Sequence, residues 1–126
     1  MKSNIYTDKA PEPIGPYSQA IEANGFVFVS GQIPLDVETG KLELENVKKA
    51  TELVMGHLDE ILRAAGSGWD KVVKVSIFLK DMAHFHEVND VYASYFDGLI
   101  PPARETVEVS RLPKDVPVEI SLIAVK

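Results

Sequence analysis

Two short segments of the sequence carry residues whose types and spacing could serve chemistry. In the first, Gly15 stands between Pro13 and Pro16, and Tyr17 follows directly. Because proline fixes φ, these residues predict a rigid bend that would hold the Tyr17 ring in one place. A tyrosine placed in this way either lines a binding site or packs on the hydrophobic core.

The second segment, residues 101–109, begins with two prolines and places Arg104 at the start of a predicted strand. Strand alternation puts Arg104 and Thr106 on one face and Glu105 on the other. The two prolines therefore hold the start of the strand rigidly, so that Arg104 has a defined position, as a residue that binds a ligand would need. The alternative is a surface cation that pairs with Glu105 or Glu108, since exposed ion pairs are common and weak.

A third candidate is Glu119, which interrupts an otherwise apolar strand. A carboxylate among apolar residues either faces solvent, as alternation permits, or lies at a site that raises its pKa. The residues that several other kinds of active site require are absent from the sequence. The chain has no cysteine, which excludes disulfides, thiolate metal sites and thiol nucleophiles. No GxGxxG, P-loop or GxSxG motif is present, and no histidine or acidic cluster has the spacing of a metal site.

The elements that must position these residues follow from the periodicities. Alternating or continuous apolar runs predict strands at residues 26–29, 71–79, 105–109 and 118–125. Apolar residues at helical spacing predict helices at 46–65, with Asn46 as N-cap and Gly66 after the C-terminus, and at 83–96. The order β, β, α, β, α, β, β predicts an α+β sandwich in which two helices cover one face of a mixed sheet.

The second face of this sheet is predicted to be partly apolar. Residues such as Val72, Phe78 and Ile123 fall on it, together with the polar Glu119. A face of this composition is poorly suited to water and well suited to a subunit interface that contains a polar site. We therefore expect a homo-oligomer.

Chain length and net charge limit the number of domains and the kinds of partner that the protein can have. The 126 residues predict a single domain over 1–126, and 45% hydrophobic with 25% charged residues is ordinary globular usage. Thirteen Lys and Arg against nineteen Asp and Glu give a net charge of −6, which makes nucleic acid and anionic membrane poor partners. No secretory h-region begins the chain and no run is long enough to span a membrane, so we expect a cytoplasmic protein.

The sequence resembles the RidA/YjgF family along its whole length and in the same order of motifs. The matching stretches are IGPYSQA (14–20), SGQIP (30–34), the helix end AAG (64–66), VVKVSIFLKDM (72–82), FxxxNxxYxxYF (85–96), PPAR (101–104) and VEVSRLPKDVPVEI (107–120). The resemblance implies a chorismate-mutase-like α+β fold and a homotrimer with sites in clefts between adjacent subunits. It also implies hydrolysis of reactive enamines and imines, 2-aminoacrylate/2-iminopropanoate and 2-iminobutanoate, to 2-oxo acids and ammonia. These intermediates would come from pyridoxal-phosphate-dependent dehydratases, and neither a metal nor a cofactor would be needed.

The resemblance also assigns roles by position. Arg104 matches the arginine that binds the substrate carboxylate, because a guanidinium offers a carboxylate two charge-assisted hydrogen bonds. Glu119 matches the glutamate that positions or activates water and moves a proton to the leaving amine. The remaining matches are substrate-cleft positions: Tyr17, Ser30, Gly31, Asn89 and Thr106. The chain departs from the family at Glu105, where relatives often have a small residue, and at Thr106, where several have cysteine.

Two alternatives to an imine deaminase remain open. A trimer that only binds or senses a small carboxylate, such as a 2-oxo acid, would use Arg104 in the same way without needing Glu119. An endoribonuclease or translation inhibitor is the less favoured alternative, because the chain is acidic and its basic residues are scattered.

Overall fold

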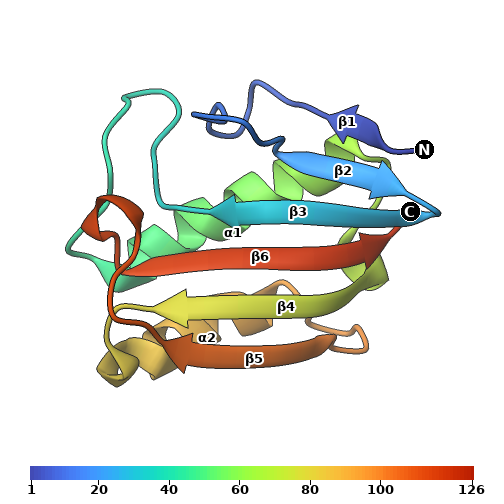
Figure 1. The fold of residues 1–126 in the computed structure, drawn as a ribbon. Coiled ribbons are helices and arrows are strands. Elements are labelled where there is room, and N and C mark those ends of the chain that lie inside the picture. Colours follow the sequence, from blue (N-terminus) through green and yellow to red (C-terminus); the bar gives the residue numbers. More distant parts are fainter.

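A computed structural model describes all 126 residues of the chain as one six-stranded sheet with two α-helices on one face (Figure 1). The strand order across the sheet is β1-β2-β3-β6-β4-β5. The strands are β1 (Ser3–Ile5), β2 (Ala20–Ala23), β3 (Phe26–Gln32), β4 (Val72–Leu79), β5 (Ala103–Glu108) and β6 (Val118–Val125). The helices are α1 (Val47–Ala64) and α2 (Phe85–Ser94), with single turns of 3₁₀ helix at Trp69–Lys71, Met82–His84 and Pro113–Asp115.

The sheet is mixed, because β4 and β5 are parallel while all other neighbours are antiparallel. The predicted α+β class with two helices on one face of a mixed sheet is confirmed. Three strands precede α1, however, where the predicted order had two and bounds were predicted for only one of them, at 26–29. The short strands β1 and β2 have only three and four residues, too few for alternation to be read reliably.

Helix α1 begins and ends at the residues that its sequence predicted. The Asn46 side chain accepts a hydrogen bond from the backbone N–H of Lys49 at 3.0 Å, as an N-cap does. At the other end Gly66 has a φ of 75°, and its N–H donates to the carbonyl of Arg63 at 3.0 Å. The N–H of Ser67 donates to the carbonyl of Leu62 at 2.9 Å, which completes a Schellman motif.

Helix α2 is shorter than the predicted 83–96. The Asp81 side chain caps the N–H of Ala83 at 2.9 Å, but the first turn is 3₁₀, so the α-helix begins only at Phe85. Its apolar side is buried, with Val88 and Tyr92 at 1% and 6% exposure. The presence of this helix is therefore confirmed, but its predicted first and last residues were wrong, since α2 begins at Phe85 and ends at Ser94.

The core lies between the two helices and one face of the sheet. Strand β6 shows the division most clearly, since Val118, Ile120, Leu122 and Ala124 are buried in alternation. The residues between them, Glu119, Ser121, Ile123 and Val125, are half-buried on the face opposite the helices, which we call the open face. This alternation was predicted for residues 118–125 and is confirmed.

Strand β4 differs from its predicted alternation at its first two residues. A register shift between Val72 and Lys74 places Val72 in the core, at 5% exposure, and Val73 outside it, at 43%. The prediction that Val72 contributes to the open face was wrong, because a β-bulge reverses the alternation on either side of it. Phe78 and Ile123 do belong to the open face.

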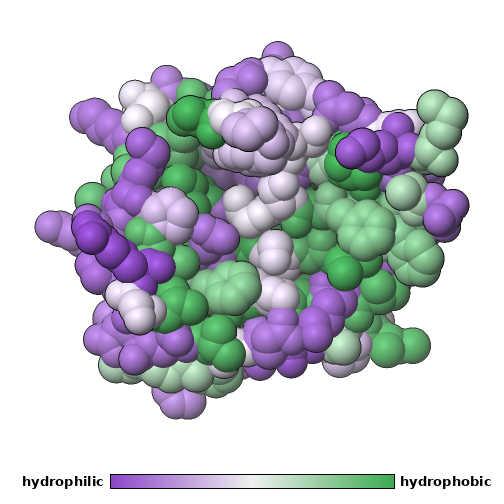
Figure 2. Space-filling view, viewed as in Figure 1, coloured by the Kyte–Doolittle hydropathy of each residue, from purple (hydrophilic) through white to green (hydrophobic).

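The open face combines apolar and small polar side chains (Figure 2). Phe28 and Val107 are 45% and 40% exposed there. A hollow of about 410 Å³ on this face is lined in part by Phe28, Ser30, Ser76 and Ser121. Neither α-helix is both long and apolar enough to cross a membrane.

Candidate functional site

A β-bulge in β3 shapes the centre of the open-face site. Val29 pairs with Leu122 and Gln32 with Ile120, so Ser30 and Gly31 together stand opposite one residue of β6. A side chain at residue 31 would overlap the carboxyl group of Glu119, whose Cδ lies 2.8 Å from the position of such a Cβ. Glycine at residue 31 therefore lets the Glu119 carboxyl lie directly against the β3 backbone.

Glu119 occupies a site of low polarity. Its cross-strand neighbour on β4 is Phe78, and its side chain forms no hydrogen bond or ion pair with another residue. Burial raises the pKa of this carboxyl above the usual range. The Glu119 side chain is therefore half-buried on the open face, between the two predicted alternatives of full exposure and burial at a site.

Tyr17 is held by the bend that its flanking residues predict. Gly15 has a φ of 120°, and the N–H of Tyr17 donates to the Gly15 carbonyl at 2.9 Å. The Tyr17 hydroxyl accepts a bond from the N–H of Ile14 at 3.4 Å. The ring is 53% exposed, so it does not pack on the core. It lies instead between the open-face hollow and a second hollow of about 370 Å³ that Gly31 also lines.

Ser30 joins the bulge to the segment that carries Tyr17. Its hydroxyl donates to the carbonyl of Ser18 at 2.6 Å, and its N–H donates to the carbonyl of Gln19 at 2.9 Å. Gln19 is 1% exposed, and its amide bonds to the backbone of Thr7 and Pro11. Sequence reasoning missed this anchoring role, because a single glutamine in a loop gives no sign that it is buried.

Arg104 lies on β5 and is held against α2. Its Nη1 donates to Oδ1 of Asn89 at 2.7 Å. The guanidinium carbon lies 4.8 Å from the centre of the Tyr92 ring and 5.7 Å from that of Phe85, both within cation–π distance. The predicted alternative, a pair with Glu105 or Glu108, does not occur. One protein acceptor leaves most of the guanidinium donors available to a ligand.

Thr106 follows Arg104 on the same face, as alternation predicts. Its hydroxyl is buried and has no hydrogen-bond partner in the chain, and the hydroxyl of Tyr92 is in the same state. Most buried side-chain polar atoms in proteins do have a partner. The Thr106 hydroxyl therefore lies on the same face of β5 as Arg104, with its hydrogen-bonding capacity unused within the chain.

Glu105 points away from Arg104, as predicted. One carboxyl oxygen lies 2.6 Å from Nζ of Lys74 on β4, and the other accepts a hydrogen bond from the hydroxyl of Ser76. The hydrogen bonds from Lys74 and Ser76, in that order, lower the pKa of the Glu105 carboxyl. Glu105 is therefore occupied on the open face and does not compete for the guanidinium.

The seven residues that the sequence singled out form two groups within one chain. In the first group, Tyr17 and Ser30 line the open-face hollow, Tyr17 and Gly31 line the second hollow, and Glu119 lies against Gly31. In the second group, Asn89, Arg104 and Thr106 lie on the helix side of the β5 edge. The sheet separates the two groups, so one chain does not bring Arg104 to Glu119. In addition, no group of three or more His, Asp or Glu side chains is arranged to hold a metal ion.

Known proteins resemble the chain over its full length. The sequence profile of the family described as Endoribonuclease L-PSP matches residues 7–126. A RutC family protein of Pyrococcus horikoshii is 52% identical over 126 residues, which cover 100% of this chain and 99% of the relative. Reactive Intermediate Deaminase A, chloroplastic, of Arabidopsis thaliana is 47% identical over 123 residues, which cover 98% of this chain and 65% of the plant protein.

Solved structures agree with this assignment. YyfA of Yersinia pestis, a protein of the Rid family described as of unknown function, superposes with a TM-score of 0.98 at 49% identity and full coverage of both chains. TdcF of E. coli, solved with bound serine, superposes with a TM-score of 0.93 at 38% identity over 98% of each chain. The motifs, the fold and these likenesses together show that the chain belongs to the Endoribonuclease L-PSP family, which is the RidA/YjgF family.

Proposed function

We propose that this protein hydrolyses reactive enamines and imines of 2-amino acids to 2-oxo acids and ammonia. The observation that carries the proposal is the Glu119 carboxyl, half-buried and unpaired, lying against the backbone of Gly31. A carboxyl in this setting can take a proton from water and give it to a leaving amine, because burial raises its pKa and so makes it a stronger base than an exposed carboxylate.

The reaction needs one carboxyl group and one water molecule. The water oxygen adds to the imine carbon of 2-iminopropanoate or 2-iminobutanoate, and the electron pair of the C=N bond moves to nitrogen. Glu119 accepts the first proton that the water loses and passes it to the nitrogen, which gives a carbinolamine. The hydroxyl group of the carbinolamine then gives up its proton, and Glu119 passes a second proton to the amino group. The C–N bond then breaks, the carbonyl forms, and ammonia leaves with pyruvate or 2-oxobutanoate as the second product.

Arg104 would bind the carboxylate that all these substrates share. The net charge of −6 repels an anion on average, so attraction must be local. Asn89 and the rings of Phe85 and Tyr92 hold the guanidinium in place, and this limits the side-chain entropy that binding would cost. Thr106 would add a hydroxyl to the same carboxylate.

The complete site would require a second copy of the chain. Arg104 and Glu119 lie on opposite faces of one sheet, so they can share a ligand only across a subunit boundary. The exposed rings and aliphatic side chains of the open face provide an apolar surface for such contact (Figure 2). A homotrimer with three equivalent clefts is the assembly we propose.

Two relatives support this function. The Arabidopsis relative is named a reactive intermediate deaminase, and TdcF was solved with serine, a small amino acid with the α-carboxylate that Arg104 would bind. A pyridoxal-phosphate-dependent dehydratase acting on serine or threonine would supply the imine. We place both reactions in the cytoplasm.

The test couples the purified protein to a threonine dehydratase and follows the release of 2-oxobutanoate. Wild-type protein should accelerate release after the dehydratase step, and Arg104→Ala should abolish the acceleration. Arg63→Ala is the matched control, because Arg63 is an exposed arginine in the last turn of α1 and belongs to neither residue group. An unchanged rate with wild-type protein would rule the proposal out.

A second candidate is a trimer that binds a small carboxylate without turnover, which the serine bound to TdcF also favours. The two candidates differ at Glu119. With Glu119→Gln, a binding protein keeps its affinity for serine or 2-oxobutanoate, whereas a deaminase keeps the affinity and loses turnover.

A further inference from the structure

A strained turn precedes β6. Lys114 and Asp115 both have left-handed backbone angles, with φ of 56° and 59°. Residues other than glycine rarely adopt this region, and two in succession are rarer still. Such strain persists only where the surroundings enforce it, and it concentrates at functional sites.

The neighbours of Lys114 enforce the turn. The N–H of Asp115 donates to the carbonyl of Leu112 at 3.1 Å, and that of Val116 donates to the carbonyl of Pro113 at 3.3 Å. Nε of Arg111 lies 3.1 Å from a carboxyl oxygen of Asp115. Leu112 and Val116 are buried on either side, so the turn is fixed at both ends.

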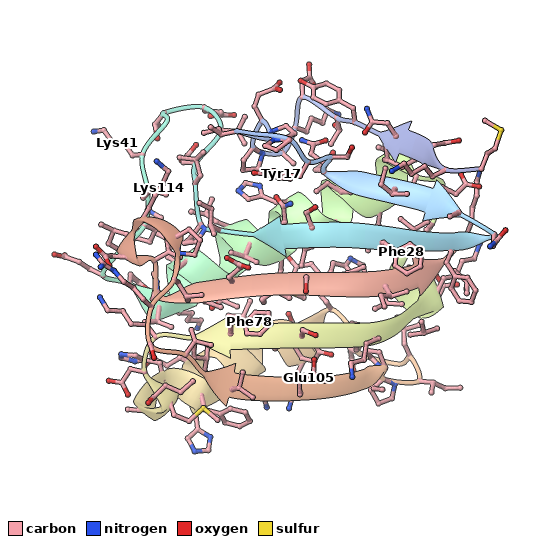
Figure 3. All side chains as sticks on the ribbon, in the orientation of Figure 1. Tyr17, Phe28, Lys41, Phe78, Glu105 and Lys114 are labelled. Atoms are coloured by element: carbon pink, nitrogen blue, oxygen red, sulfur yellow. The ribbon has the colours of Figure 1, made fainter.

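Lys114 is the residue that this turn leaves unengaged. Its side chain makes no hydrogen bond, and no carboxylate lies within 4.0 Å of its Nζ. It lines the hollow of about 370 Å³ to which Tyr17 and Gly31 also belong, and it is the only cation that does so. Figure 3 labels Lys114 on the connection before β6 and Tyr17 on the segment before β2.

The other walls of the hollow suit an extended ligand side chain. Ile14, Ile33 and Leu35 provide apolar surface. The only acidic residue in the wall is Glu12, whose carboxylate already accepts a hydrogen bond from the Tyr6 hydroxyl. The hollow therefore offers a ligand beside Gly31 both apolar side chains and the unpaired ammonium group of Lys114.

We propose that Lys114 is a specificity residue that extends the substrate range to imines with a second, distal carboxylate, such as those formed from acidic amino acids. This inference rests on the proposed function. The α-carboxylate would lie on Arg104 of a neighbouring copy, the imine carbon beside Glu119 and Gly31, and the distal carboxylate on Nζ of Lys114. An ammonium group recognises a carboxylate as a point charge without demanding one orientation, which suits a flexible ligand chain.

The test compares two imines with the same number of carbon atoms, 2-iminobutanoate from a threonine dehydratase and 2-iminosuccinate from an aspartate oxidase. Hydrolysis is measured in competition with semicarbazide trapping, for wild type and for Lys114→Ala, Lys114→Glu and Lys114→Arg. Lys41→Ala is the control, because Lys41 is an exposed lysine that does not line the hollow. Figure 3 labels Lys41 on the loop between β3 and α1.

We expect Lys114→Ala to lower kcat/KM for 2-iminosuccinate about tenfold, through KM, as expected when a charge-assisted contact is lost. The value for 2-iminobutanoate should stay within about twofold, since that substrate has no distal charge. Lys114→Glu should lower the first value further, and Lys114→Arg should restore most of it. Equal losses for both imines, or no hydrolysis of 2-iminosuccinate by wild type, would overturn the inference. Failure of wild type on both imines would instead overturn the proposed function.

Lys114→Gly guards against a folding artefact. Glycine adopts a positive φ without strain, so this variant should fold at least as stably as wild type. It should nevertheless lose the preference for the dicarboxylate as Lys114→Ala does. A glycine variant that keeps the preference would contradict the role of the lysine side chain.

Discussion

Arg104 and Glu119 project from opposite faces of the same sheet. Arg104 bonds to Asn89 of α2 on the helix side, whereas Glu119 lies against Gly31 on the open face. A ligand a few atoms long cannot reach around β5 to touch both residues of one chain. If both residues serve one reaction, each active site takes its arginine and its glutamate from different copies.

This separation predicts that two inactive variants complement each other. Arg104→Ala and Glu119→Gln subunits, refolded together in equal amounts, form trimers in which a cleft can combine the intact Arg104 of one copy with the intact Glu119 of another. Random assembly of a cyclic trimer should restore roughly a quarter of the wild-type sites. Imine hydrolysis by the mixture, compared with each variant refolded alone, measures the recovery.

The control for complementation is a mixture of Arg104→Ala with an Arg104→Ala, Glu119→Gln double variant, which contains no intact arginine and should recover nothing. Recovery confined to the first mixture supports a shared site. A first mixture that is as inactive as its components, although mixed trimers form, would show that each chain builds its own site.

The sequence was sufficient to predict the elements that depend on local rules. Asn46 and Gly66 define the ends of α1 through a cap and a left-handed residue, both of which are local properties. Alternation placed Arg104 and Glu105 on opposite faces of β5, and the ion pair of Glu105 with Lys74 confirms it. The Gly15 bend could also be read from its flanking prolines, although they did not decide whether Tyr17 lines a site or packs on the core.

Features that depend on pairing between strands could not be predicted. The bulge at Ser30 and Gly31 is visible only in the register with β6, and the one at Val72 only in the register between β4 and β6. The division of the site residues between two faces follows from the position of β5 at the sheet edge beside α2. The left-handed turn at Lys114 was also missed, because lysine does not favour positive φ and the aspartate that follows it adopts it only occasionally.

Gly31→Ala is predicted to lower activity more than it lowers stability. A Cβ at residue 31 overlaps the Glu119 carboxyl group, and the atoms that must move are the far end of a flexible side chain. We expect a cost of about 1 kcal/mol in the free energy of unfolding. Imine hydrolysis should fall at least about tenfold, because the carboxyl loses its position. Thermal melts and the coupled dehydratase assay measure the two effects.

The matched variant for this test is Gly56→Ala, in α1, where an added Cβ would meet nothing within 4 Å. It should raise stability by about 0.5–1 kcal/mol, as alanine does in place of glycine within a helix, and leave activity unchanged. A Gly31→Ala protein with wild-type kinetics would show that the position of the Glu119 carboxyl is not critical.

Thr106→Val is predicted to separate binding from stability. Valine keeps the shape of threonine and removes a buried hydroxyl that has no partner in the chain, so the variant should be as stable as wild type or more so. If Thr106 donates to the substrate carboxylate, KM should rise by about threefold to tenfold, as expected for one hydrogen bond. Steady-state kinetics and melts test this. Unchanged kinetics would leave Thr106 with a packing role only.

Glu119 is predicted to link pH to both activity and stability. Burial raises its pKa, so a reaction that needs the carboxylate should lose activity as pH falls through that raised value, with one proton taken up.

Stability should change with pH in the opposite direction, so that it decreases where activity increases. A raised folded-state pKa favours folding below the unfolded-state pKa of the carboxyl, and this contribution is lost as pH rises through the folded-state value. Glu119→Gln cannot ionise, so melts across this range should show the variant gaining stability relative to wild type as pH rises. A stability difference that does not change with pH would mean that the Glu119 carboxyl titrates as an ordinary exposed glutamate, and its assignment as the proton-transfer group would then be wrong.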